Sequence, residues 1–446
     1  MHFTIQKGLD IPISGAPRPW LEPGKPVRHA ALLGLDYVGL KPSMAVREGD
    51  QVPVGQLLFT DKKNPGVRFT APVGGRIVAI NRGPQRRFES MVIEIGGDDR
   101  LVFETGGSGQ ADPVAIKEVL VASGLWTALR ARPFGKVPNL EAKPTALFVT
   151  AMATDPLAVD PAVVIAEAAD DFGLGLRMVR TLAPKTYLCC RPNFSLPAAN
   201  LPGITVARFS GPHPAGLAGT HIHFIEPVRQ GKEVWHLGFQ DVIAIGHLFR
   251  TGYLRTHTVI ALAGPAMLNP RLIRTVPGAA LDELCVDEFP QATSRLVSGS
   301  VLSGHTAVGH VAYLGRYDQQ VCALPDRDGS GLFSWLRPGA DRFSRLPVFL
   351  SAFAAPRAEG LAMSTAAWGG RRAIFPLGTY ERVLPLNLVA TPLLKSIAMG
   401  NTEKAAELGC LELVEEDLAL CSFVCPGKND FGPMLRHVLT RIEADG

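Results

Sequence analysis

Two stretches near the start of the chain alternate apolar and polar residues between tight-turn residues. The first, M-A-V-R-E-G-D-Q-V-P-V-G-Q-L-L, runs from Met44 to Leu58, and the second, A-P-V-G-G-R-I-V-A-I, from Ala71 to Ile80. A period of two places every other side chain on the same face of a strand, and the Gly-Asp and Gly-Gly dipeptides supply turns. This pattern predicts an antiparallel all-β module.

The two stretches closely resemble the halves of a biotinyl/lipoyl barrel-sandwich domain. A carrier domain of that kind presents a modified lysine on the hairpin between its halves, where this chain reads T-D-K-K-N-P-G with Lys62 and Lys63. No methionine flanks either lysine, and Pro65 lies nearby. We therefore expect solvated turn residues there rather than a swinging arm. A free-standing carrier, or a soluble binding protein, is the alternative function.

The chain has 446 residues, which is too long for one hydrophobic core. Linker composition from Thr105 to Asp112 marks one boundary. We expect a multidomain α/β protein with four parts, namely a barrel-sandwich domain over 1–104, a Rossmann-like α/β domain over 112–255, a β-grasp domain of the soluble ligand-binding type over 256–335, and a mainly helical domain over 336–446.

Apolar runs alternate with helical patterns in the second domain. This alternation predicts a largely parallel sheet covered by helices. The expected strands are Ala146–Ala151, Thr186–Cys190 and Ile204–Phe209, and the expected helices are Val114–Ser123, closed by Gly124, and Pro161–Phe172, closed by Gly173. The G-x-G of Gly173 and Gly175 follows a helix and lacks its third glycine, so it is not a dinucleotide fingerprint.

The segment Gly124–Pro138, G-L-W-T-A-L-R-A-R-P-F-G-K-V-P, is expected to be a loop between a helix and a strand, where an α/β domain usually binds its ligand. It could hold an anion, an aromatic ring or a partner protein, or it could be a basic loop with its aromatic side chains in the core. Few free backbone N–H groups are available to hold a phosphate, because only Gly135 allows close approach and Pro133 has no N–H. We expect no tightly bound nucleotide. The candidate residues are Trp126, Arg130, Arg132, Phe134 and Lys136.

Histidines and cysteines are the residues that could bind a metal. In a strand, His221 and His223 would share a face and form a workable zinc pair, but no nearby residue completes a coordination shell. We expect buried or hydrogen-bonding histidines, His213 included. Cys421 and Cys425 lack the C-x-x-C spacing of ferredoxin-type clusters, so we expect buried thiols in a helical bundle. Its apolar faces are Leu393, Leu394 and Ile397, and Leu435, Val438, Leu439 and Ile442.

Composition narrows the function. A formal charge of +4 with no dense Lys/Arg run argues against nucleic-acid binding. No apolar run approaches the roughly 18 residues of a spanning helix. We expect no signal peptide, because the N-terminus has no basic region followed by an apolar one. Seven dispersed cysteines indicate a reducing cytoplasm.

The order of the domains resembles three related components of electron-transport complexes. They are the flavin-bearing NADH-binding subunit of respiratory complex I, the C subunit of the Rnf complex, and the A subunit of the bacterial sodium-translocating NADH:quinone reductase. The third resemblance covers nearly the whole chain. Four segments carry it, namely Gly124–Pro138, G-F-Q-D-V-I-A-I-G-H-L-F (Gly238–Phe249), A-L-A-G-P (Ala261–Pro265) and C-S-F-V-C-P-G-K-N-D-F-G-P (Cys421–Pro433).

The resemblance implies a peripheral subunit on the cytoplasmic side of the inner membrane, in a six-subunit complex that moves electrons from NADH to ubiquinone and pumps sodium outward. FAD, FMN, riboflavin and a 2Fe-2S cluster would lie on other subunits. This chain departs from its flavin- and cluster-bearing relatives at R-A-R-P-F-G-K and at C-S-F-V-C, so no redox centre of its own is implied, and the C-terminal domain resembles a degenerate iron–sulfur domain. It would act in assembly, and it could also bind quinone through the five candidate residues.

Overall fold

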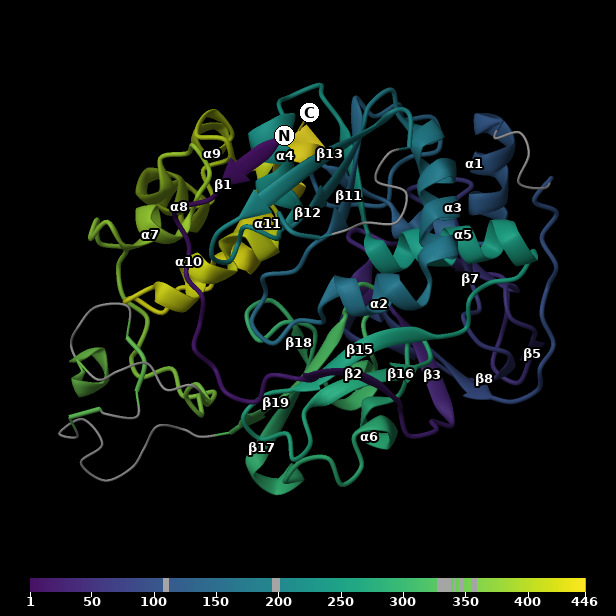
Figure 1. Ribbon diagram of the computed structural model, residues 1–446, viewed down its shortest axis with the longest axis horizontal. Coiled ribbons are helices and arrows are strands. Elements are labelled where there is room, and N and C mark those ends of the chain that lie inside the picture. Colours follow the sequence, from purple (N-terminus) through teal and green to yellow (C-terminus); the bar gives the residue numbers. More distant parts are fainter. Residues whose placement is uncertain are drawn as a thin grey trace.

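A computed structural model describes residues 1–106, 112–194, 201–326, 338–339, 342–344, 349–353 and 359–445. The expected linker over 105–112 and the expected boundary at 335/336 lie largely or wholly outside these ranges. In Figure 1 the helical C-terminal part lies at the left, a mixed sheet lies at the bottom, and the barrel-sandwich strands lie at the lower right. The two termini lie close together at the top of that view.

The barrel-sandwich part consists of two antiparallel sheets. One sheet pairs β3 (His29–Leu33), β9 (Phe88–Ile95), β8 (Gly75–Arg82) and β5 (Gln51–Val52), and the other pairs β4 (Pro42–Met44), β6 (Leu57–Asp61) and β7 (Arg68–Thr70). The predicted alternation appears as burial of Val52, Leu58, Val73 and Ile77 in one core cluster. The all-β prediction for this region is confirmed.

The hairpin between β6 and β7 is tethered at its tip. Lys62 and Lys63 are exposed, as expected for turn residues. The next residue, Asn64, donates from its side-chain amide to the carbonyl oxygens of Val137 and Pro138, at 3.0 and 3.2 Å. A carrier hairpin must swing free of its own chain, whereas this one is hydrogen-bonded to the neighbouring domain.

The α/β part is built on a six-stranded sheet in which all neighbours but one pair are parallel. Its order is β1 (His2–Thr4), β13 (Ile204–Ser210), β12 (Thr186–Cys190), β11 (Ala146–Ala151), β14 (Val234–Gly238) and β10 (Arg130–Arg132), with β10 antiparallel to β14. Helices α2 (Pro161–Glu167), α3 (Ala169–Val179) and α5 (Phe239–Thr251) pack on one face, and α4 (Ala218–Ile225) on the other; α1 (Pro113–Ala122) precedes β10.

The predicted helix Pro161–Phe172 was wrong at its end. Helix α2 ends at Glu167. A second helix, α3, begins at Ala169 and runs through Gly173 and Gly175 to Val179. Gly175 does not terminate a helix. It lets α3 approach α5 closely, since a Cβ atom there would lie 1.9 Å from the carbonyl oxygen of Val242.

The third part is built on a six-stranded mixed sheet with the order β18 (His305–Thr306), β17 (Ser294–Ser298), β19 (Gln320–Pro325), β15 (Thr258–Ala263), β16 (Arg271–Thr275) and β2 (Arg18–Pro23), with the short helix α6 (Leu281–Leu284) beside it. Strands β1 and β2 thus carry the first 23 residues into the sheets of the second and third parts. The region 1–104 contributes strands to all three parts, which joins them from the N-terminus onward.

The C-terminal part contains α7 (Thr379–Val383), α8 (Ala390–Ala398), α9 (Thr402–Glu407), α10 (Ala419–Val424) and α11 (Phe431–Asp445). The predicted apolar faces on α8 and α11 pack into one core, with Ile442 partly buried. Cys410, Cys421 and Cys425 are buried free thiols of the same core, as expected.

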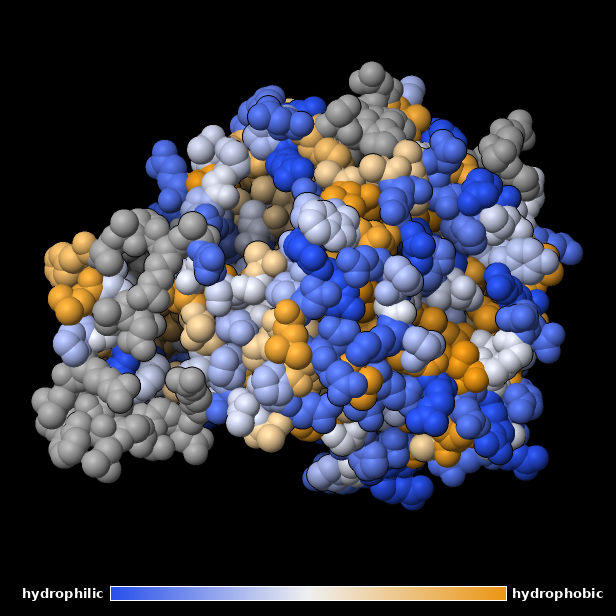
Figure 2. All heavy atoms as spheres, turned by 60° about the horizontal axis from the view of Figure 1, so that its bottom comes forward, coloured by the Kyte–Doolittle hydropathy of each residue, from blue (hydrophilic) through white to orange (hydrophobic). Residues whose placement is uncertain are grey.

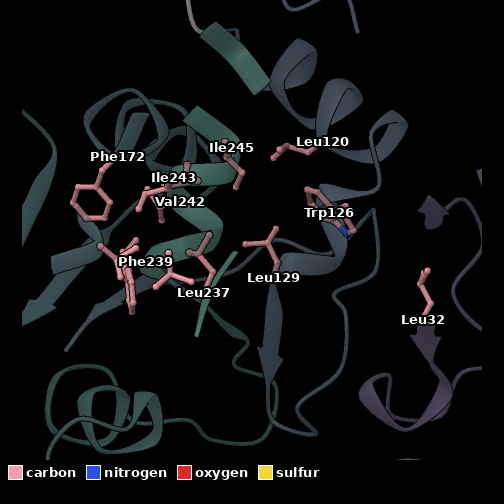
Figure 3. Packing of buried hydrophobic residues seen from close by; sticks show 14 of the residues in the cluster. Leu32, Leu120, Trp126, Leu129, Phe172, Leu237, Phe239, Val242, Ile243 and Ile245 are labelled. Carbon is pink, nitrogen blue, oxygen red and sulfur yellow. The ribbon is translucent and has the colours of Figure 1, made fainter. Parts of the chain in front are cut away.

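A single core runs from the barrel-sandwich part into the α/β part. Figure 3 shows Leu32 of β3 at the right, with Trp126 and Leu120 between it and the α5 side chains Ile243 and Ile245, while Leu129 lies beside Leu237. Because this core is shared, the first two parts cannot separate without exposing apolar side chains to water. Each Å² of apolar area that is buried stabilises the folded state by about 25 cal/mol.

Candidate functional site

A polar cleft of about 440 Å³ lies at the carboxyl ends of β11 and β14. From β11 the chain proceeds outward to β12 and β13, then returns to β14 on the opposite side of β11. This reversal is a topological switch point, where open α/β sheets bind their ligands. Thr150 and Met152 near the end of β11, and Gly238 and Phe239 between β14 and α5, line the cleft.

Residues from the other parts close the cleft. Asp36 follows the barrel-sandwich strand β3, Tyr317 and Asp318 precede β19, and Glu415 and Glu416 come from the C-terminal part. The guanidinium of Arg130 lies 4.8 Å from the centre of the Tyr317 ring. The cleft therefore sits where all four parts of the chain meet.

Two carboxyl groups in the cleft wall have raised pKa values. Burial, followed by the charge of Asp318, raises the pKa of Asp36 to about 8. Burial also raises the pKa of Asp318, although the Ser298 hydroxyl donates to it at 2.6 Å. At neutral pH Asp36 is therefore largely protonated and can donate a hydrogen bond.

The segment Gly124–Pro138 is not the simple loop that the sequence predicted. It forms a short 3-10 helix, Leu125–Ala128, followed by β10, which pairs with Val234–His236. A tight hairpin follows, in which Gly135 N–H donates to Ala131 O at 2.9 Å and Ala131 N–H donates to Lys136 O at 2.7 Å. These backbone donors are used within the segment, so they do not form a phosphate cradle.

Trp126 is part of the core. Its indole N–H donates to Pro138 O at 2.9 Å, and its ring meets Trp235 edge-on at 5.3 Å between centroids. Only 1% of the residue is exposed. Phe134 turns the opposite way and packs against the C-terminal core, where its carbonyl accepts from Arg436 at 2.6 Å.

The cations of the segment are paired with the C-terminal part. Arg132, 0% exposed, contacts Asp417 at 2.6 Å and Glu416 at 3.3 Å, and donates to Glu412 O at 3.1 Å. Burial alone would lower the pKa of Arg132, but the nearby carboxylates outweigh it and the pKa is raised. Lys136 pairs with Glu443 of α11 at 2.5 Å.

Of the five candidate residues, Arg130 alone lines the cleft. Its guanidinium is 3.9 Å from Glu416 and about a quarter exposed. The other four are turned toward the core or the C-terminal part. Sequence reasoning missed Asp36, which comes shortly after β3. It also missed Tyr317 and Asp318, whose only signal was the polar run R-Y-D-Q before the buried strand β19.

The histidine pair lies on a helix, so the strand on which the zinc hypothesis depended was wrong. Two residues apart on α4, His221 and His223 point to different sides. His221 is buried and bonded to Ala215 O at 3.0 Å, whereas His223 contacts Glu412 at 2.6 Å. His213 is also buried, beside the Thr154 hydroxyl at 3.2 Å. Nowhere in the described ranges do three or more His, Cys, Asp or Glu side chains gather as a metal site.

Fold and cleft together define a class: a multidomain α/β protein in which a barrel-sandwich domain, a largely parallel sheet and a mixed β domain border a cleft at a topological switch point. Family comparisons agree with this organisation. Residues 3–96 match the NqrA N-terminal barrel-sandwich hybrid domain, 111–254 the NqrA second alpha/beta domain, and 259–309 the NQRA C-terminal domain.

Three relatives align with 100% of both chains, and each is named as the A subunit of a Na(+)-translocating NADH-quinone reductase. They come from Actinobacillus pleuropneumoniae serotype 5b (strain L20), 51% identical over 451 residues; Pseudomonas aeruginosa (strain PAO1), 51% over 447; and Pasteurella multocida (strain Pm70), 49% over 448. The chain belongs to this family, which confirms the resemblance. No helix within the described residues is both long and apolar enough to cross a membrane.

Proposed function

We propose that this chain is a peripheral subunit of a Na(+)-translocating NADH:ubiquinone reductase, bound on the cytoplasmic side of the membrane as one of six subunits. It carries no redox centre of its own. Its relatives are subunits of such a reductase by name. FAD, FMN, riboflavin and a 2Fe-2S cluster belong to the other subunits in this proposal. The face shown in Figure 2 supports a peripheral position, because hydrophilic residues predominate over its right-hand part.

The primary role proposed is architectural. The observation that carries it is the pairing of Gly124–Pro138 with the C-terminal part, through Arg132 with Asp417 and Lys136 with Glu443. Segments that would hold a flavin phosphate at the sheet edge instead bind another part of the same chain. Three acidic residues, Glu415, Glu416 and Asp417, stand at this edge and pair with Arg436, Arg130 and Arg132. These cations are therefore not free to hold a phosphate.

The test is a mild-detergent pull-down of the tagged full-length chain from its native membranes. We expect co-purified flavoprotein partners and sodium-stimulated NADH:quinone reductase activity. The variant Arg132→Met should lower the amount of assembled complex, whereas Lys62→Ala, on the exposed hairpin, should not. A lone, colourless chain in the soluble fraction would refute the proposal and favour a free binding protein.

Quinone binding is the second candidate. The observation that favours it is the cleft itself, where Arg130 and the Tyr317 ring offer a cation and an aromatic face. The variant Arg130→Met should raise the KM for ubiquinone while assembly stays unchanged. A photoreactive quinone should label this chain in the intact complex, and labelling confined to the other subunits would exclude this role.

A further inference from the structure

A second cavity, of about 150 Å³, lies where the barrel-sandwich part, α5 and the mixed sheet of the third part meet. We name it the junction cavity. It adjoins the cleft and shares Asp36, Tyr317 and Asp318 with it. Its apolar wall includes Leu32, Phe69, Leu125, Ala244, Leu254 and Pro277. An apolar cavity of this volume has room for one benzene-sized ring.

One end of the junction cavity is cationic. Arg255 and His257 both line it, and the Arg255 Nε–H donates to His257 Nε2 at 3.1 Å. Burial lowers the pKa of His257 to about 4, so the imidazole is neutral at pH 7. Because Nε2 accepts a hydrogen bond, the ring proton is on Nδ1. The pair therefore offers the remaining guanidinium donors and one imidazole N–H.

Among the described residues, Arg255 has no close carboxylate partner of its own. The carboxylates that act on it are engaged elsewhere, because Asp171 binds Arg250 at 2.6 and 3.1 Å and Glu167 binds Arg274 at 2.8 Å. Asp170 acts on Arg250 as well, so the cluster as a whole is close to charge balance while Arg255 itself pairs with none of the described carboxylates. None of the ion pairs found in the described part of the chain includes Arg255. His247, which acts on His257 from outside the lining, contacts Asp171, and burial lowers the pKa of His247.

The other polar groups of the wall are mostly satisfied within the protein. The bonded pairs are Gln240 with the backbone of Val259 at 2.7 and 2.9 Å, Asp241 with Arg316 at 2.6 Å, and the Tyr317 hydroxyl with Thr127 O at 2.8 Å. The donors that remain are those of Arg255 and His257, together with the protonated carboxyl of Asp36. A partly desolvated cation without a counterion is costly, and an anion placed beside it would remove that cost.

We propose that the junction cavity binds a small monocarboxylate with an aromatic or branched aliphatic body. The carboxylate accepts hydrogen bonds from Arg255 and His257, and the body packs against Ala244 and the other apolar residues of the wall. This site is separate from the quinone question, which concerns the adjoining cleft. It also does not depend on assembly with other subunits, because all its lining residues belong to this chain.

The test uses benzoate as the probe and the full-length chain at pH 7, with binding followed by calorimetry or saturation-transfer NMR. The weak limit of ligand efficiency, scaled to a molecule of this size, corresponds to a Kd of about 10 mM. We expect saturable binding at or below that value. Benzyl alcohol has a similar shape without the charge, and it should bind about tenfold or more weakly.

Two variants test separately the contribution of the Arg255 charge and that of the cavity volume to benzoate binding. Arg255→Met should weaken benzoate binding about tenfold or more, and Ala244→Leu should abolish it by filling the cavity. Arg177→Met removes an exposed arginine outside the lining and should leave binding unchanged. Absence of saturable benzoate binding, equal binding of benzyl alcohol, or unchanged binding by Arg255→Met would each overturn the proposal. The comparison of the two ligands on the unaltered chain needs no variant to fold.

Discussion

The contact between Arg132 and Asp417 makes the sharpest prediction about stability. The guanidinium is 0% exposed, the carboxylate is 3% exposed, and 2.6 Å separates them. Arg132→Met keeps most of the apolar volume but leaves Asp417 buried without its counterion. Removing one partner of a buried ion pair costs about 3–5 kcal/mol. We expect a loss of that size in the free energy of unfolding of the C-terminal part.

The loss should depend on pH. Burial already raises the pKa of Asp417, and removal of Arg132 should raise it further. A carboxyl whose pKa is higher in the folded state than in the unfolded state is favourable while it is protonated, and the folded state loses stability as pH rises through the folded-state pKa. The variant should therefore be closer to the unaltered protein at pH 5 than at pH 8.

Urea denaturation of the full-length chain, followed by tryptophan fluorescence and limited proteolysis, measures this loss. The double variant Arg132→Met with Asp417→Asn removes both charges and keeps an oxygen for the Val414 N–H, which Asp417 accepts at 2.8 Å. It should recover about 2 kcal/mol relative to Arg132→Met alone. A loss below about 1 kcal/mol in the single variant, or no recovery in the double, would refute the view that this pair holds the two parts together.

Three further outcomes follow from the geometry. Gly175→Ala should lower the free energy of unfolding of the α/β part by about 1–3 kcal/mol or more, because the new Cβ would clash with Val242 O. Gly96→Ala is the control, since it has open space around it and should leave thermal denaturation nearly unchanged. Asp36 holds its proton up to a pKa of about 8 when folded but loses it near 4 when unfolded, so stability should fall as pH rises across that window, and Asp36→Asn should flatten the profile. Asn64→Ala should expose the β6–β7 hairpin to proteolysis, and the intact mass should remain that of an unmodified chain.

Local pattern was enough to predict most of the secondary structure. Strands β11 and β12 begin and end where their apolar runs do, and Gly124 adopts a left-handed conformation with φ of 79° after α1. The apolar faces of α8 and α11 also lie in the predicted core. Each of these features is determined by residues that lie within a few positions of one another in the chain. Hydrophobic periodicity and helix-capping patterns describe such short-range relations, so they are sufficient to predict them.

Long-range pairing could not be predicted in the same way. Nothing in H-F-T or R-P-W-L-E-P indicates that β1 joins β13 or that β2 joins β16, because a strand of three to six residues has many compatible partners. The same limit applied to Arg132. From the sequence alone, the charge of Arg132 suggested that it binds a ligand. In the structure its counterion is Asp417, which lies 285 residues away in the chain.

The charges around the cleft decide which ligands it can accept. The C-terminal turn Glu415–Leu418 brings two carboxylates to the wall, and Glu415 pairs with Arg436 at 2.5 Å. Glu416 is shared between Arg130 at 3.9 Å and Arg132 at 3.3 Å. A dinucleotide or flavin phosphate would have to displace these contacts and approach Glu416, at an electrostatic cost. A neutral quinone ring would meet Arg130 and a protonated Asp36 without that cost, so the charges of the wall favour a quinone over a phosphate-bearing cofactor, and the quinone role can be tested on this chain.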